Sequence, residues 1–165
     1  MTEKGTTIVY GNEICRVVDI KPMTLGKISR EYYVLSPVYD TKNTIYVPAD
    51  NQNLTAKMRK LLSVDEIYAV IDTVQENKVV WIDDDRERNI RFKQVIEKGD
   101  SKEIIGMIAA IFEHKLEVEK QSKKLHSADE MLLERAEKVI YEEIALVLDI
   151  AKEDVVSFIM KRLEK

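Results

Sequence analysis

The amino-acid composition changes about a third of the way along the chain of 165 residues. All three prolines and five of the seven tyrosines lie within the first 48 residues. Residues 1–60 carry nine basic and six acidic side chains, a net charge of +3, whereas residues 61–165 carry 17 and 24, a net charge of −7. We therefore expect two parts that differ in architecture and in partner.

The first part has the pattern of short β-strands. β-branched and aromatic residues are concentrated in four segments, and Gly11-Asn12 is a turn signal between the first two. So few short strands cannot form a sandwich of normal size, whereas a bent antiparallel barrel leaves little sheet edge exposed. We predict a small barrel of the SH3 or Tudor type, with strands near residues 6–10, 14–20, 30–38 and 43–47.

Beyond residue 53 the apolar residues recur at helical spacing. Ser63 with Glu66, and Ser127 with Glu130, match the capping box that begins many helices. Gly99 is a typical residue just beyond a helix C-terminus. We predict a bundle of about five helices. The predicted fold class is thus α+β, with an SH3/Tudor-like β-barrel over residues 1–52 and an all-helical domain over 53–165.

Residues that carry catalysis or bind metals are scarce. The chain has one cysteine and two histidines, and it lacks phosphate-binding loops and hydrolase motifs. Cys15 lies in a predicted strand, with Arg16 on the opposite face, so we expect a core residue and not a reactive thiol. We expect Asp83–Asp85 to lie at the exposed start of a helix, where acidic groups are favoured. We expect His126 to be a solvated side chain. We expect no enzyme activity, cofactor, metal site or small-molecule substrate.

Hydropathy excludes a membrane span. The longest stretch without a charge is the nine residues Ile104–Phe112, whereas a spanning helix needs about 20 apolar residues. The first residues contain no apolar segment of the kind found in secretory signals. We expect a cytoplasmic protein with no membrane partner.

Trp81 is the only tryptophan of the chain, and a predicted helix with four cations follows it. An aromatic ring beside cations can stack on or wedge between bases while the cations contact phosphates. The alternative is a core tryptophan that links the two domains, with the cations on a solvated helix face. Residues 81–93 also contain four carboxylates and are neutral overall. Both interpretations stay open, and the candidate DNA-binding residues are Trp81, Arg86, Arg88 and Lys93.

Several segments resemble the CarD/CdnL family of bacterial transcription regulators. The opening Ile8-Val9-Tyr10-Gly11 is similar to the start of that family, and Thr44–Asn51, read as TIYVPADN, is similar to a strand and turn of its first domain. Trp81 and the segment Leu133–Glu137 are similar to the family's helical domain. The resemblance extends over nearly the whole chain.

This resemblance implies a Tudor-like domain, shared with the transcription-repair coupling factor, that binds the β subunit of RNA polymerase. Mapped onto this chain, a strand edge at Thr44, Tyr46 and Val47 would contact the polymerase. The helical domain would approach promoter DNA through weak, mostly non-sequence-specific contacts. Trp81 would insert at the minor groove near the melted region and stabilise the open complex.

Two hypotheses follow. The first is a non-enzymatic transcription regulator that binds the polymerase β subunit and modulates the stability of the promoter open complex. The second is a protein-interaction adaptor whose acidic helical domain docks another protein and contacts no DNA. An exposed Trp81 ring beside the cations favours the first hypothesis, and a buried ring favours the second.

Overall fold

Five strands and one short helix make up the first of two units in the computed structural model, which describes residues 2–164. This unit extends to Leu61, and the second begins at Leu62. The elements of the first unit are β1 (Thr7–Tyr10), β2 (Glu13–Leu25), β3 (Ile28–Pro37), β4 (Ile45–Pro48), α1 (Gln52–Thr55) and β5 (Met58–Lys60).

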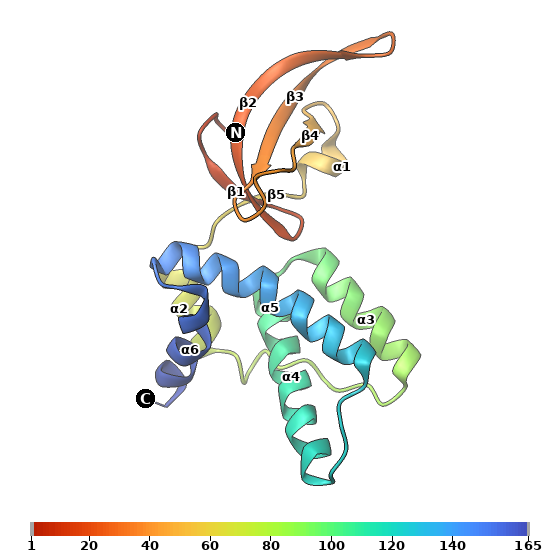
Figure 1. Ribbon diagram of the computed structural model, residues 1–165, viewed down its shortest axis with the longest axis vertical. Coiled ribbons are helices and arrows are strands. Elements are labelled where there is room, and N and C mark those ends of the chain that lie inside the picture. The colour runs from red at the N-terminus through yellow and green to blue at the C-terminus, as the bar shows by residue number, and fades with distance from the viewer. Residues whose placement is uncertain (1, 165) are drawn as a thin grey trace. The chain divides into compact units, whose positions relative to one another are not determined.

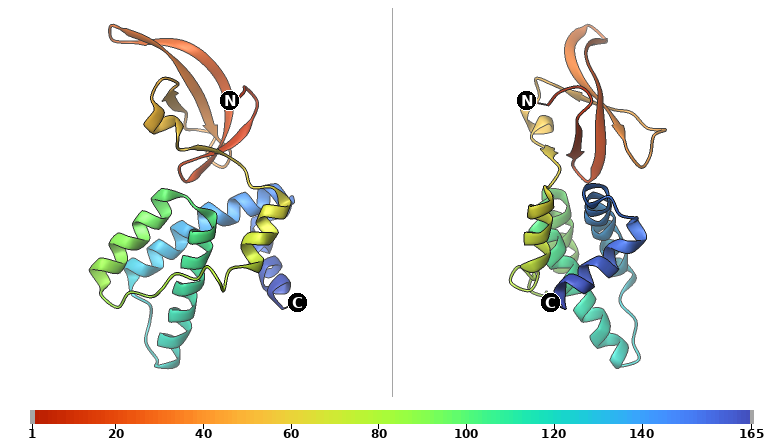
Figure 2. Two further views of the ribbon diagram at one scale, coloured as in Figure 1. Left: turned by 180° about the vertical axis from the view of Figure 1, so that it is seen from behind. Right: turned by 90° about the vertical axis from the view of Figure 1, so that its left-hand side faces the viewer.

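The five strands form one antiparallel sheet in the order β4-β3-β2-β1-β5. β2 and β3 form a long hairpin that is paired as far as Leu25 and Ile28 and that bends along its length (Figures 1 and 2). At its tip Gly26 has a φ of +67°, a left-handed conformation that glycine adopts without steric cost. The α+β class is confirmed. The barrel is not, because no pairing joins β4 to β5 in the described residues and both remain edge strands.

Alternating residues of the strands build a small core in this unit. Cys15 is completely buried, as the sequence predicted, and burial raises the pKa of its thiol to about 11. At neutral pH this thiol is protonated and unreactive. The other buried members of the cluster are Ile8, Val17, Leu35 and Val47.

The first unit is longer than the 52 residues predicted for it. β5 pairs with β1, with Met58 opposite Tyr10 and Lys60 opposite Ile8, so the chain returns to the sheet after α1. The sequence does not signal this strand, because Met58–Lys60 contains only three residues and two of them are cations. The pairing places the unit boundary at Leu61.

The second unit is helical. Among the described residues it contains five α-helices and one 3-10 helix, in agreement with the predicted bundle (Figure 1). None of the helices in residues 2–164 is long and apolar enough to cross a membrane. The elements are α2 (Val64–Asp72), α3 (Asp85–Lys98), α4 (Ser101–Lys120), α5 (Ser127–Leu148), η1 (Lys152–Asp154) and α6 (Val155–Leu163).

Most of the predicted helix ends are confirmed. The Ser63 hydroxyl accepts a hydrogen bond from the main-chain N–H of Glu66, whose carboxylate accepts one from the Ser63 N–H, so both halves of the capping box form. Gly99 ends α3 in the left-handed conformation, with a φ of +76°. The prediction of a capping box at Ser127 was wrong. His126 occupies the cap position without a side-chain hydrogen bond, because Ser127 is already the first helical residue.

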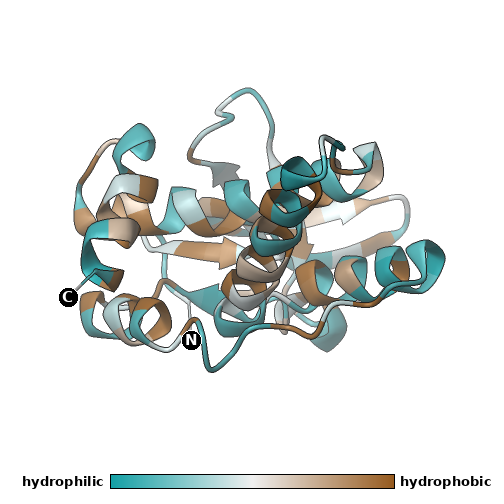
Figure 3. Cartoon of the chain, turned by 90° about the horizontal axis from the view of Figure 1, so that it is seen from below, coloured by the Kyte–Doolittle hydropathy of each residue, from teal (hydrophilic) through white to brown (hydrophobic). Residues whose placement is uncertain are grey.

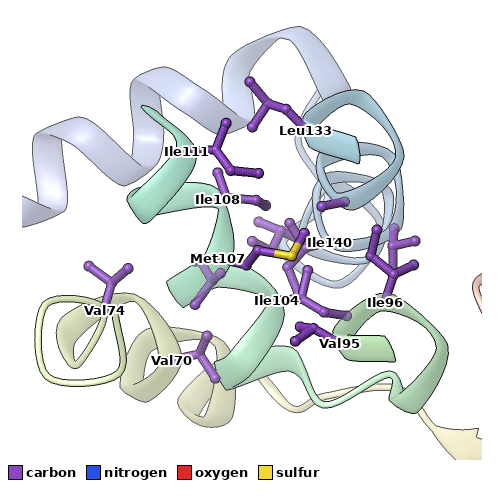
Figure 4. Close-up of a cluster of buried hydrophobic side chains, with 14 of the residues drawn as sticks. Val70, Val74, Val95, Ile96, Ile104, Met107, Ile108, Ile111, Leu133 and Ile140 are labelled. Atoms are coloured by element: carbon purple, nitrogen blue, oxygen red, sulfur yellow. The ribbon is translucent and has the colours of Figure 1, made fainter. Parts of the chain in front are cut away.

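Apolar and polar residues recur in turn along each helix (Figure 3). Each helix therefore has an apolar face, and the helices pack against one another through these faces. Figure 4 shows Met107 of α4 beside Ile104 and Ile140, at the centre of the buried cluster. α4 crosses the cluster, and α2, α3 and α5 each contribute side chains to it. Its largest fully buried members are Phe92, Ile67, Ile71, Ile96, Ile104, Met107, Ile111, Ile140 and Ile144.

Gly106 allows the segment before Trp81 to lie directly on α4. A Cβ atom at this glycine would lie 2.0 Å from the carbonyl oxygen of Asn77, a distance that main-chain atoms cannot tolerate. The Val79 N–H donates to the Gly106 carbonyl oxygen at 3.4 Å. The glycine thus fixes where the segment that leads to Trp81 crosses the helix.

We predict that Gly106→Ala lowers the free energy of unfolding by about 1–3 kcal/mol, because the methyl group displaces Asn77. At an unconstrained helix position the same change would stabilise by up to about 1 kcal/mol. Urea denaturation measures the difference. Lys102→Ala, on the exposed face of α4, is the control and should change stability by less than about 0.5 kcal/mol. An unchanged or raised stability of Gly106→Ala would contradict the close packing.

Candidate functional site

β4 forms an exposed edge of the sheet in the first unit. The Tyr46 side chain is 47% exposed, and Thr44, directly before the strand, is also exposed. The Ala49 N–H donates to the Glu31 carbonyl oxygen of β3 at 2.9 Å. Because main-chain groups alternate in direction along a strand, those of Tyr46 point away from β3. Tyr46 therefore offers both a side chain and main-chain hydrogen-bonding groups at this edge.

Val47 does not belong to the exposed part of this edge. Its side chain is completely buried in the core of the first unit, and it lies opposite Tyr33 of β3. The same alternation that exposes Tyr46 turns its neighbour inward. Pro48, which follows, has no N–H to donate. The accessible edge predicted at Thr44, Tyr46 and Val47 is thus reduced to Thr44 and Tyr46.

Trp81 is half-buried within the second unit, where it packs against the helical core. The imidazole of His114 on α4 stacks on the indole, with ring centroids 3.9 Å apart and an angle of 16° between the planes. Phe92 of α3 meets the indole edge-on, at 6.0 Å and 69°. The guanidinium carbon of Arg88 lies 4.5 Å from the ring centroid. The ring is held by aromatic and cation–π contacts from two helices.

Arg88 is a buried structural residue and not a surface cation, which corrects its predicted role in DNA contact. The side chain is only 3% exposed, and Nε and Nη2 donate to the two carboxylate oxygens of Asp129 on α5 at 2.9 and 2.7 Å. Nη1 donates to the carbonyl oxygen of Ile82 at 2.9 Å. Nη2 also donates to Asp85 at 2.8 Å, and this bond lowers the pKa of that carboxyl. Its donors are engaged and cannot reach a phosphate.

Arg86 and Lys93 remain as the exposed members of the predicted cationic set. They lie seven residues apart on α3, so they share one face of the helix. The carboxylates of Asp83, Asp84 and Asp85 lie at the N-terminal end of the same helix and are exposed. Attraction and repulsion toward a phosphate therefore compete within one short stretch of chain.

A groove of about 560 Å³ opens beside Trp81. The residues that line it come from the segment before α3 and from the C-terminal half of α4, and they combine apolar side chains with charged ones. Carboxylates outnumber ammonium groups in this lining. The lining residues are Lys78, Val79, Val80, Trp81, Asp83, Ala110, Glu113, His114, Glu117, Val118 and Gln121.

A second, more apolar groove of about 600 Å³ lies between α4 and α6. Its rim contains large apolar side chains that are 40–56% exposed, among them Phe112, Leu116 and Met160. The sequence signalled it only weakly, because these residues extend the apolar stripe of each helix by one position. Their exposure depends on how far apart α4 and α6 lie.

Two residues that shape the Trp81 region were missed by sequence reasoning. His114 follows Trp81 by 33 positions and Asp129 follows Arg88 by 41, and neither lies in a motif. No local pattern distinguishes them from other polar residues on their helices. Only the packing of α3, α4 and α5 brings them to the indole and the guanidinium.

Comparison with known protein families identifies the domain family of the first unit. Residues 3–62 match the model of the CarD-like/TRCF RID domain, which covers the sheet of the first unit from before β1 to beyond β5. The first unit therefore belongs to this domain family, and the match supports the resemblance of the chain to CarD-like proteins. A domain of this family implies a transcription-related function that involves RNA polymerase. No curated protein matches the chain.

We predict that Asp129→Asn lowers the free energy of unfolding by about 3–5 kcal/mol, because it leaves the buried Arg88 guanidinium without its counter-charge. The double variant Arg88→Met/Asp129→Leu removes both charges and should lose less than either single change. Urea denaturation followed by Trp81 fluorescence measures both variants and the single changes Arg88→Met and Asp129→Leu.

The exposed pair between Arg91 and Glu103, 3.5 Å apart, provides the control. Arg91→Met should cost less than about 1 kcal/mol, because solvent screens this pair. Equal effects of Asp129→Asn and Arg91→Met would contradict a special role for the buried pair.

Proposed function

We propose that the chain is a non-enzymatic transcription regulator that binds the β subunit of RNA polymerase and, while bound, changes the stability of the promoter open complex. The observation that carries the proposal is the membership of residues 3–62 in the CarD-like/TRCF RID domain family, together with the open edge at β4. The polymerase supplies the catalysis, and this chain supplies contacts.

The β4 edge suits a protein partner. A strand of the polymerase can add to an open sheet edge through main-chain hydrogen bonds, while side chains on the edge give specificity. Tyr46 offers an outward-facing main chain and a half-exposed aromatic ring, a residue type that often dominates binding energy at interfaces. The net charge of +3 over residues 1–60 favours an acidic partner surface.

The non-enzymatic part of the proposal rests on the state of the few reactive groups. Cys15 is buried and its thiol has a raised pKa. His114 is stacked on Trp81. Neither is arranged as a nucleophile with an adjacent base, the pattern that covalent catalysis requires.

Within this proposal, the geometry favours an adaptor role for the helical unit, that is, contact with a protein and not with DNA. Arg88 is engaged with Asp129, and carboxylates outnumber ammonium groups around Trp81. A polyanion is repelled by such a lining. DNA contact through Trp81, Arg86 and Lys93 is the second candidate, because these two cations are exposed on one face of α3.

We predict that Tyr46→Glu weakens binding of the intact chain to purified RNA polymerase at least about tenfold, because it places a carboxylate at the edge where the partner strand adds. Biosensor binding to the core enzyme measures the effect, and crosslinking identifies the subunit. The matched control is Tyr39→Glu, at a tyrosine of similar exposure outside β4, 49% against 47%. Equal loss in both variants would remove the β4 edge from the proposal.

We further predict that the double variant Arg86→Ala/Lys93→Ala changes open-complex lifetime by the same factor as the wild-type chain, within about twofold. The physical reason is that the nearby carboxylates offset the two cations. Decay of preformed open complexes against a DNA competitor measures the lifetime. If the variant bound polymerase normally but no longer changed the open-complex lifetime, this result would establish the DNA contact and contradict the adaptor role.

A further inference from the structure

We propose that the groove beside Trp81 binds an arginine-bearing segment of a protein partner. The proposal rests on the adaptor role of the helical unit and adds the chemistry of the partner. It is carried by two features that meet beside Trp81: apolar walls and an excess of carboxylates.

The walls suit the aliphatic part of a long cationic side chain. Val79, Val80, Ala110 and Val118 line the groove, and Val80 is 81% exposed. Arginine buries its methylene groups along apolar surfaces of this kind while its charged end stays near polar groups. A lining made of apolar residues alone would favour an aliphatic side chain instead.

The charges of the lining are complementary to a cation. Lys78 is its one ammonium group, and it forms an ion pair with Glu113. Asp83 and Glu117 are exposed and form no ion pair within residues 2–164. The groove thus has two carboxylates available for an incoming guanidinium, which binds carboxylates through paired hydrogen bonds.

Trp81 borders the groove, but its ring is already in contact with the stacked imidazole of His114 at 3.9 Å and with the Arg88 guanidinium at 4.5 Å. Recognition of the partner therefore rests on the carboxylates and the apolar walls beside the indole. A phosphate group would meet Asp83 and Glu117 without a free cation in the lining to oppose them. The same groove therefore discriminates between a basic protein segment and nucleic acid.

The neighbouring groove between α4 and α6 does not have this charge pattern. Its charged lining residues are Lys78 and Glu113, which pair with each other. Nothing in its lining selects a cation over an apolar side chain. Of the two grooves, the one beside Trp81 is therefore the groove whose charges select a cationic partner.

Fluorescence of the intact chain tests the proposal, because Trp81 is its only tryptophan. The probe is a short end-blocked peptide of alternating arginine and glycine. The matched peptide replaces arginine with citrulline, which keeps the shape and removes the charge. We expect a saturable change in Trp81 emission with the arginine peptide, and binding at least about fivefold weaker with the citrulline peptide.

Variants locate the binding. Asp83→Asn/Glu117→Gln should weaken arginine-peptide binding at least about fivefold. Glu119→Gln, which removes a carboxylate from α4 outside the groove, should change it by less than about twofold. Equal weakening by Glu119→Gln and by Glu117→Gln alone would show binding to the overall negative charge and would overturn the proposal.

Two further outcomes are decisive. A duplex DNA that shifts Trp81 emission where the arginine peptide does not would assign the groove to nucleic acid and overturn the proposal. Polymerase binding of the wild-type chain separates the groove proposal from the proposed function. A wild-type chain that binds polymerase but not the arginine peptide would overturn only the groove proposal, whereas one that binds the peptide but not polymerase would overturn only the proposed function.

Discussion

The buried ion pair between Arg88 and Asp129 is the interaction on which the Trp81 region depends. It joins α3 to α5, and through the carbonyl oxygen of Ile82 it also holds the segment that leads into α3. Removing two charges from water is costly, and only the paired hydrogen bonds make the arrangement tolerable. The guanidinium that satisfies Asp129 also lies over the Trp81 ring, so the helix packing and the shape of the candidate surface share one side chain.

This arrangement changes the electrostatic character of the helical unit. A cation that sequence alone would place on the surface is used inside the fold, whereas the carboxylates at the start of α3 stay exposed. The surface around Trp81 is in consequence more acidic than the sequence suggests. Exposed carboxylates attract cationic side chains and repel phosphates, which is why we propose a protein partner for this unit.

The first unit presents a different kind of surface. Its sheet is open, and its edge strand β4 offers main-chain groups and Tyr46 in place of a pocket. An open edge of this kind is suited to a partner that adds a strand, and in the function proposed above charge would serve mainly to steer the approach. In these proposals the first unit would recognise its partner through main-chain groups and the second through side chains.

Local sequence was enough wherever neighbours along the chain decide the structure. The capping box at Ser63, the helix end at Gly99 and the burial of Cys15 all follow from residues within a few positions, and all were predictable. The strand β5, the open edge of the sheet and the burial of Arg88 were not, because each depends on a partner far away in sequence. A guanidinium carries the same charge on the surface and in the core. Only the packing that brings Asp129 to Arg88 decided that this side chain lies in the core.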